Sequence, residues 1–169
     1  FQGWGAVFYP KEFIQELIKF AKKHDMLVTF DEMQAGFGRT GKLFGYEHYE
    51  VEPDILCCGK GASSGLPLAI VLASKEIMDL PDIGSMSSTH SANPLVCVAG
   101  EENLKAMIED ELIENSERLG KIFHQKLNDI KDKYPQYIKY VLGKGLLAAL
   151  IFIDEEGKVL SDLCDRVSE

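Results

Sequence analysis

The sequence has little of what marks several common classes of protein. Basic residues are few, since 18 Lys and Arg stand against 27 Asp and Glu, which gives a formal net charge of -9. This balance argues against a nucleic-acid groove or an anionic membrane surface as the main partner. No apolar run approaches the roughly 18 residues that cross a bilayer. We therefore expect no nucleic-acid partner and no membrane segment.

Cysteine is also scarce, and its spacing argues against two further classes. None of the four cysteines forms a CxxC pair: Cys57 and Cys58 are adjacent within apolar sequence, and Cys97 and Cys164 are isolated. Structural zinc sites and small disulfide scaffolds depend on spaced cysteine pairs. We therefore expect no metal site, a reducing cytoplasmic setting, and buried apolar roles for Cys57 and Cys58.

The remaining composition is that of an ordinary globular protein. Of 169 residues, 46% are hydrophobic and 27% are charged. This length fits one domain or one and a fraction, and it allows a real core. The chain begins at Phe1 without a methionine and stops within an apparent helix start. We expect it to be a piece of a longer protein.

The first half of the sequence alternates between helical and strand patterns. Apolar residues recur with a helical period over 11–25, directly after Pro10. Short apolar runs at 26–30, 55–58 and 68–73 are typical of buried strands. Strands separated in this way indicate an α/β fold with a mostly parallel sheet.

The pattern changes from Asn93 onward. Residues 94–134 predict one long or two consecutive amphipathic helices. Runs at 137–142 and 146–154 predict two strands around a glycine turn, and a last helix is expected near Ser161. We therefore expect part of one domain over 1–100 and a smaller α+β part over 101–169.

Three polar residues stand at or just after predicted strand ends. Asp31 closes the run 26–30, Gln34 lies shortly after it, and Lys60 stands between two glycines after the run 55–58. In open α/β sheets, ligands bind at the carboxyl ends of the strands. We therefore expect Asp31 and Lys60 to face one pocket.

Three interpretations of this acid and amine are open. The first is a plain salt bridge. The second is an ATP site, because an apolar run that ends in Asp-Glu is typical of a magnesium-binding strand. That site needs a GxxxxGK[ST] loop, but Asp54 stands in place of its first glycine and Gly61 follows Lys60. The third is a covalent role for the amine.

The covalent interpretation accounts for both residues. A lysine amine reacts with the aldehyde of pyridoxal phosphate, which also requires an acid at its ring nitrogen. The acid keeps that nitrogen protonated, so the ring draws in the electrons left when a substrate proton departs. Glycines beside Lys60 would let backbone and cofactor approach closely. The ATP interpretation explains neither Asp31 nor Lys60 well.

A longer motif surrounds these residues. FDEMQAGFGRTG is followed by a PDI and GKG element, then by GLP, and STHSANPLVCVAG continues it at 88–100. The sequence resembles the cofactor-binding core of the class III aminotransferases, which are pyridoxal-phosphate enzymes of fold type I. The resemblance covers nearly the whole chain, although members of the family are much longer. It implies the C-terminal part of the large domain over 1–100, and connecting helices with the start of the small C-terminal domain over 101–169.

The resemblance also implies roles for four residues. Lys60 is the lysine that forms a Schiff base with pyridoxal 5'-phosphate and carries the proton. Asp31 pairs with the pyridinium nitrogen, and Gln34 hydrogen-bonds the ring hydroxyl. Thr89 reaches the cofactor phosphate of the neighbouring subunit, which implies a homodimer with shared active sites.

The implied activity is transfer of an amino group from an amine or ω-amino acid donor to a keto-acid acceptor. Some family members with the same motifs are aminomutases or phospho-lyases, so these reactions remain alternatives, as does a nucleotide-binding α/β module. Many ω-transaminases have a glutamate where this chain has Trp4. That difference argues against a preference for ornithine or acetylornithine. The family's phosphate-cup loop and carboxylate-binding arginine lie outside this sequence, so we expect the isolated piece to have little or no activity.

The same residues also have purely structural interpretations. Asp31 alone would be a helix cap and Lys60 alone a surface charge. Thr89 would cap the helix that follows it, a role compatible with a cofactor contact. Glu32 is expected to pair with a nearby base, and Arg39 is expected to anchor the glycine-rich loop.

Overall fold

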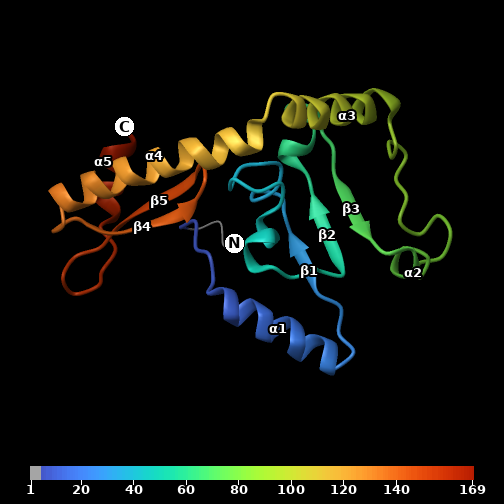
Figure 1. Cartoon of the computed structure of the whole chain (residues 1–169), viewed down its shortest axis with the longest axis horizontal. Helices are drawn as coiled ribbons and strands as arrows, with labels where there is room; N and C mark the ends of the chain where they lie inside the picture. The colour runs from blue at the N-terminus through green and yellow to red at the C-terminus, as the bar shows by residue number, and fades with distance from the viewer. Residues whose placement is uncertain (1–4) are drawn as a thin grey trace.

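Three short strands form the first sheet of the computed structural model, which describes residues 5–169 (Figure 1). They are β1 (Thr29–Asp31), β2 (Ile55–Cys58) and β3 (Ile70–Ala73), in the order β1-β2-β3. β1 and β2 pair in parallel, whereas β3 runs antiparallel to β2. The expected parallel arrangement therefore fails for β3. Its connection to β2 holds only the short 3-10 helix η2 (Lys60–Ala62), and a parallel return requires a longer crossover.

Helix α1 (Lys11–Lys23) packs one face against η1 and against Phe30 of β1. Ile14 and Ile18 form a small core with Tyr49, which belongs to the 3-10 helix η1 (Gly45–Tyr49). The predicted helix is confirmed, but the strand predicted from residue 26 begins only at Thr29. The chain leaves α1 through a left-handed residue at 25, so pairing with β2 starts after that turn.

A long exposed segment separates the first sheet from the second half of the chain. It follows the single-turn helix α2 (Lys75–Met78), and every residue over 78–95 is exposed. Figure 1 shows this segment running outside the sheet to α3 (Pro94–Glu109). The Asn93 side chain caps α3 by accepting a hydrogen bond from the Leu95 amide at 3.0 Å. The prediction that Thr89 caps this helix is therefore wrong.

The second half consists of helices and a hairpin. α4 (Leu112–Lys133) follows α3 after a break at Glu111, whose φ of 51° is left-handed. β4 (Ile138–Lys144) and β5 (Leu147–Phe152) pair antiparallel, and α5 (Ser161–Ser168) ends the chain. Two consecutive helices, two strands and a last helix are confirmed. The expected domain boundary after residue 100 falls inside α3. No helix within residues 5–169 is both long and apolar enough to cross a bilayer.

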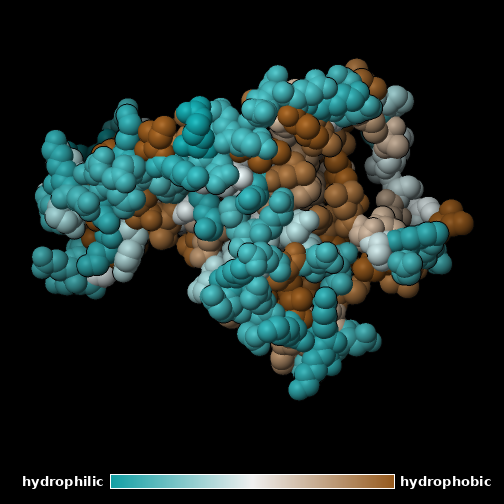
Figure 2. Space-filling view, in the orientation of Figure 1, coloured by the Kyte–Doolittle hydropathy of each residue, from teal (hydrophilic) through white to brown (hydrophobic). Residues whose placement is uncertain are grey.

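Apolar side chains remain exposed over much of the first half. Figure 2 shows a hydrophobic surface beside the sheet and beneath α3. Val71 and Leu72 on β3 have 51% and 46% of their surface exposed to solvent. Phe13 and Phe20 on α1 have 54% and 56% exposed. Exposed apolar patches of this kind mark surfaces that pack against other protein. α1 thus buries only one of the two apolar faces that its sequence provides.

Candidate active site

Lys60 and Gln34 line one cavity of about 260 Å³. Gln34 belongs to the loop after β1, and Lys60 begins η2 directly after β2. Because β1 and β2 are parallel neighbours, the loops at their carboxyl ends lie side by side. The other lining residues are Met33, Gly36, Arg39, Gly61 and Leu147. The sequence prediction that brings Gln34 and Lys60 together is therefore consistent with this arrangement.

The Lys60 turn is held close to the loop after β1. Lys60 has a φ of 45°, a left-handed conformation that residues other than glycine adopt rarely. A Cβ added at Gly59 would lie 2.5 Å from Met33 Sδ, and one at Gly61 would lie 3.2 Å from Phe37 Cβ. The flanking glycines therefore make room for Met33 and Phe37. This explains their position in the sequence without a cofactor contact.

The Lys60 ammonium group is exposed and has no carboxylate partner among the described residues. The same holds for Asp31, so the salt-bridge interpretation of this pair is wrong within residues 5–169. An amine without a fixed partner at a cavity wall is available to a ligand. The arrangement therefore favours a binding or covalent role over a structural ion pair.

Asp31 lies at the end of β1 opposite Cys57 of β2, but it does not line the Lys60 cavity. Its Oδ1 accepts a hydrogen bond from the Met33 amide at 3.0 Å, so the carboxylate caps its own turn. It lines a separate cavity of about 210 Å³ beside α1. The two strand ends are adjacent as expected, but the acid and the amine line two separate cavities, so the prediction that Asp31 and Lys60 face one pocket is wrong within this chain.

Glu32 is the buried acid of this loop, with 2% of its surface exposed. Its two oxygens accept hydrogen bonds from the Gly45 and Tyr46 amides, each at 2.8 Å. Burial raises the pKa of its carboxyl, and the two amide hydrogen bonds oppose that rise. None of the ion pairs within residues 5–169 includes Glu32. The prediction that it pairs with a base is wrong, because backbone amides take both oxygens.

The glycine-rich loop is anchored to the second half of the chain through the Arg39 backbone. The Arg39 carbonyl accepts hydrogen bonds from the Leu146 amide at 2.9 Å and from Ser116 Oγ at 3.3 Å. Leu147, which directly follows Leu146, lines the Lys60 cavity. Sequence reasoning missed this contribution from the β4–β5 turn. Gly143 and Gly145 marked the turn, but no local pattern indicates which distant loop it contacts.

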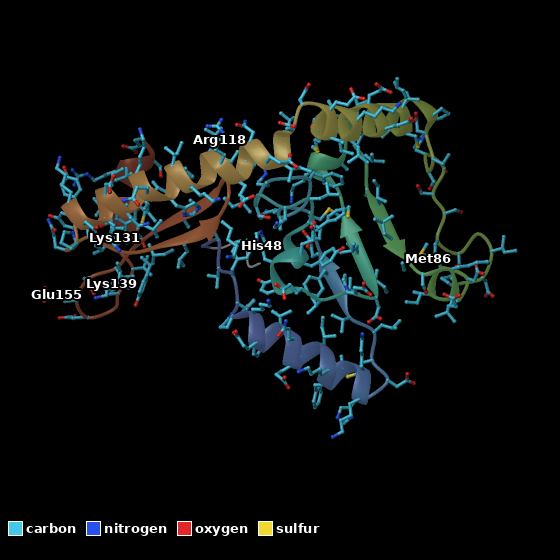
Figure 3. The ribbon with its side chains drawn as sticks, viewed as in Figure 1. His48, Met86, Arg118, Lys131, Lys139 and Glu155 are labelled. Atoms are coloured by element: carbon cyan, nitrogen blue, oxygen red, sulfur yellow. The ribbon has the colours of Figure 1, made fainter. Side chains whose placement is uncertain are left out.

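Thr89 does not line the cavity that holds Lys60. It belongs to the exposed segment between α2 and α3. Figure 3 labels Met86 on this segment, well away from His48 near the middle of the molecule. Within one chain, Thr89 lines neither the cavity of Lys60 and Gln34 nor the cavity of Asp31.

Cys58 behaves as the buried apolar residue that the sequence predicts. It retains 1% of its surface, and burial raises the pKa of its thiol to about 11. The thiol therefore stays protonated near neutral pH and is a poor nucleophile. Cys57 is only half-buried, and both are free thiols.

Comparison with known protein families matches residues 2–169 to the family described as aminotransferase class-III. The match extends over nearly the whole chain. The chain belongs to the class-III aminotransferases. This membership confirms the resemblance found in the sequence motifs. The Lys60 cavity therefore belongs to a member of a transferase family.

Relatives of this family have similar sequence and structure. The chain is 39% identical over 171 residues to an ornithine aminotransferase of Plasmodium yoelii yoelii, which covers 99% of this chain and 41% of that protein. It is 38% identical over 163 residues to a protein named alanine/serine racemase of Pyrococcus horikoshii, covering 96% of this chain and 34% of the relative.

Solved structures agree with these sequence matches. An ornithine aminotransferase from Plasmodium yoelii superposes with a TM-score of 0.86 at 36% identity, covering 97% of this chain and 44% of that chain. An S-selective transaminase from Arthrobacter sp., solved with alanine bound, gives a TM-score of 0.85 at 37% identity, covering 94% and 34%. These neighbours confirm the fold class. The chain spans about a third to two fifths of its curated relatives, and Trp4 lies outside the described residues.

Proposed function

We propose that the protein containing this chain is a pyridoxal-phosphate-dependent aminotransferase. It would move an amino group from an amine or ω-amino acid donor to a keto-acid acceptor. The observation that carries the proposal is the free Lys60 amine in one cavity with Gln34, within a class-III aminotransferase sequence. Pyridoxal phosphate, when bound, would supply an aldehyde for an amine and a ring that withdraws electrons from the substrate carbon.

Lys60 and Gln34 fit such a group in one cavity, and Asp31 lies at the adjacent strand end in a separate cavity. Lys60 offers an amine that no described carboxylate neutralises, and Gln34 offers an amide hydrogen-bond donor in the same cavity. Asp31 offers an exposed carboxylate of which only Oδ1 has a hydrogen bond among the described residues. In this proposal Asp31 would hold a proton on the ring nitrogen and Gln34 would donate to the ring hydroxyl. Lys60 would take the proton from the donor carbon and return it to the cofactor.

Thr89 has a different place in the proposal. It would bind the cofactor phosphate of a second subunit, so that each active site of a homodimer uses two chains. The exposure of the whole segment over 78–95 supports this role. Its apolar side chains Leu80 and Met86 support it as well, because 73% and 81% of their surface is exposed to solvent. The large and small domain parts would divide near residue 100, and the four free thiols support a cytoplasmic setting.

A racemase is the second candidate, because the Pyrococcus horikoshii relative named alanine/serine racemase is 38% identical to this chain. Groups outside this piece would decide which bond of the substrate is broken, so aminomutase and phospho-lyase reactions remain alternatives as well. All of these reactions would use the same Lys60 amine for proton transfer.

The test is amino-group transfer by the full-length protein with pyridoxal phosphate. We expect an amino donor alone to give one equivalent of carbonyl product (an aldehyde or a ketone) per site and a change in cofactor absorbance, which a keto acid then reverses. Inversion of an amino acid without keto product would replace the proposal with racemisation. Phosphate release without an acceptor would replace it with a lyase.

A further inference from the structure

Asn103 lies in the interior of α3 and faces the turn that carries Lys60. Asparagine is a poorer helix former than most residues found inside helices, because its amide competes for backbone groups. At this position the amide instead bonds outside its own helix. Figure 1 shows α3 lying across the end of the sheet where η2 follows β2.

The Asn103 amide makes three hydrogen bonds to this turn. Nδ2 donates to the Gly61 carbonyl at 2.8 Å and to the Ala62 carbonyl at 3.1 Å. Oδ1 accepts a hydrogen bond from Ser64 Oγ at 2.6 Å. Two carbonyl acceptors require the NH2 end, which fixes the orientation of the amide. One half-buried side chain therefore holds three of the four residues that follow Lys60.

These bonds act on a turn with an unusual backbone. Lys60 and Ser64 both have left-handed φ values, of 45° and 53°. Across the turn, the Ala62 amide donates a backbone hydrogen bond to the Gly59 carbonyl at 3.0 Å. Such conformations persist when surrounding contacts fix them. Asn103 supplies such contacts from α3.

We propose that Asn103 is a positioning residue for Lys60. It acts through the Gly61 and Ala62 carbonyls, and it fixes the turn so that the Lys60 side chain points along the cavity that it shares with Gln34. The inference rests on the proposed function, in which Lys60 transfers the proton. A helix of the second half of the chain thereby sets the geometry of a group at the end of β2.

The central test is Asn103→Ala in the full-length protein, measured by kinetics and by hydrogen exchange. Because small misplacements of a reacting group slow chemistry strongly, we expect kcat to fall roughly tenfold while KM changes less than about twofold. In the protein without cofactor, we expect amide exchange in the peptide 59–64 to accelerate at least about fivefold, since the turn opens more often.

Three further variants separate positioning from general stability. Asn103→Asp keeps the acceptor for Ser64 but loses both donors, so we expect it to lose as much kcat as Asn103→Ala. Ser64→Ala removes only the Ser64 contact and should keep kcat within about twofold of the original protein. Asn128→Ala is the matched control, because Asn128 Nδ2 also donates to a carbonyl, that of His124 at 2.8 Å, within α4. It should change neither kcat nor exchange in peptide 59–64.

Unchanged kcat in Asn103→Ala would overturn the inference, whatever the exchange result. A similar fall in kcat in Asn128→Ala would also overturn it. The proposed function fails separately, if the unmodified protein transfers no amino group. If that protein is active and Asn103→Ala is equally active, only the positioning role is lost.

Discussion

Glu32 illustrates at the residue scale how the glycine-rich loop is fixed beside the site. It directly follows Asp31, and it reaches across to the first amides of η1. These amides come at the start of a helical turn, where they have no partner within the turn. A carboxylate there satisfies both donors and interacts favourably with the positive end of the turn. Glu32 therefore ties Gly45 and Tyr46 to the residues that precede Gln34.

Replacing Glu32 with alanine should destabilise the protein substantially. The Gly45 and Tyr46 amides would be left without acceptors, and each buried unpaired amide costs about 1–3 kcal/mol. We expect the free energy of unfolding of the full-length protein to fall by about 2–4 kcal/mol in Glu32→Ala. Urea denaturation measures this free energy. The control is Glu52→Ala at an exposed position, expected within about 0.5 kcal/mol of the original protein. Equal effects of the two changes would contradict this role.

The pH dependence of stability should also report Glu32. Burial raises the pKa of the Glu32 carboxyl above its usual value of 4.5, so the folded protein holds this proton more tightly than the unfolded chain. The stability that this group contributes to the folded protein is therefore fully present below the usual pKa, and it is lost as pH rises through the folded-state pKa. Glu32→Gln removes that dependence.

We expect the stability advantage of the original protein over Glu32→Gln to be larger at acidic pH than at neutral pH. Urea denaturation of both proteins across this range gives the difference directly. A difference that is constant, or that grows toward neutral pH, would show that the pKa is not raised.

At the scale of elements, the β4–β5 turn connects the second half of the chain to the glycine-rich loop. Gly145 has a φ of 57°, and a Cβ added there would lie 2.4 Å from the Thr40 carbonyl carbon. The adjacent Leu146 amide bonds to the Arg39 carbonyl, and Leu147 reaches the Lys60 cavity. The absence of a side chain at Gly145 thus permits this approach.

Gly145→Ala should be more harmful than the same change at Gly157. Gly157 also has a left-handed φ, of 83°, but an added Cβ would meet no atom within 4 Å. Both variants carry a backbone penalty of about 1 kcal/mol, and only Gly145→Ala adds a steric clash, worth about 1–3 kcal/mol. We expect a lower melting temperature and weaker pyridoxal phosphate binding for Gly145→Ala alone. Indistinguishable variants would mean that the turn does not pack on Thr40.

The elements differ in how far the sequence predicts them. α1 and α4 have clear helical periods, and the structure confirms them. The sequence predicts too early a start for β1, because the apolar Met26 and Leu27 resemble strand residues although they lie in irregular chain between the turn after α1 and β1. The antiparallel β3 and the contact between Gly145 and Thr40 depend on distant pairings. The position after strand ends indicated Lys60 and Gln34, and the motif resemblance supplied their roles, whereas Leu147 and Asn103 carry no local signal of theirs.

At the scale of the whole molecule, the chain is a part of a larger architecture. Apolar side chains on α1, β3 and the segment 78–95 are exposed, and the chain spans about 41% of its Plasmodium yoelii yoelii relative. In the proposed dimer, Thr89 of one subunit would serve the Lys60 site of the other. In that arrangement, an active site requires Lys60 on one chain and Thr89 on the other chain of the same dimer.

Mixing two inactive full-length variants tests this arrangement. We expect Lys60→Ala and Thr89→Ala to be strongly impaired alone, and to regain activity when unfolded together and refolded as mixed dimers. One site of each mixed dimer would then hold Lys60 from one chain and Thr89 from the other. Up to about one quarter of the original activity should return if chains pair at random, because half of the dimers are mixed and each has one intact site. No recovery would show that Thr89 serves its own chain or neither.

The central claim is that Lys60 is the lysine that binds the cofactor aldehyde. The most direct measurement incubates the full-length protein with pyridoxal phosphate, reduces it with borohydride, and locates the modified lysine by mass spectrometry. Label confined to Lys60, and reduced in Asp31→Ala, is the result expected from the free amine in the Gln34 cavity. Label spread over exposed lysines such as Lys22 and Lys23, with none at Lys60, would contradict the claim.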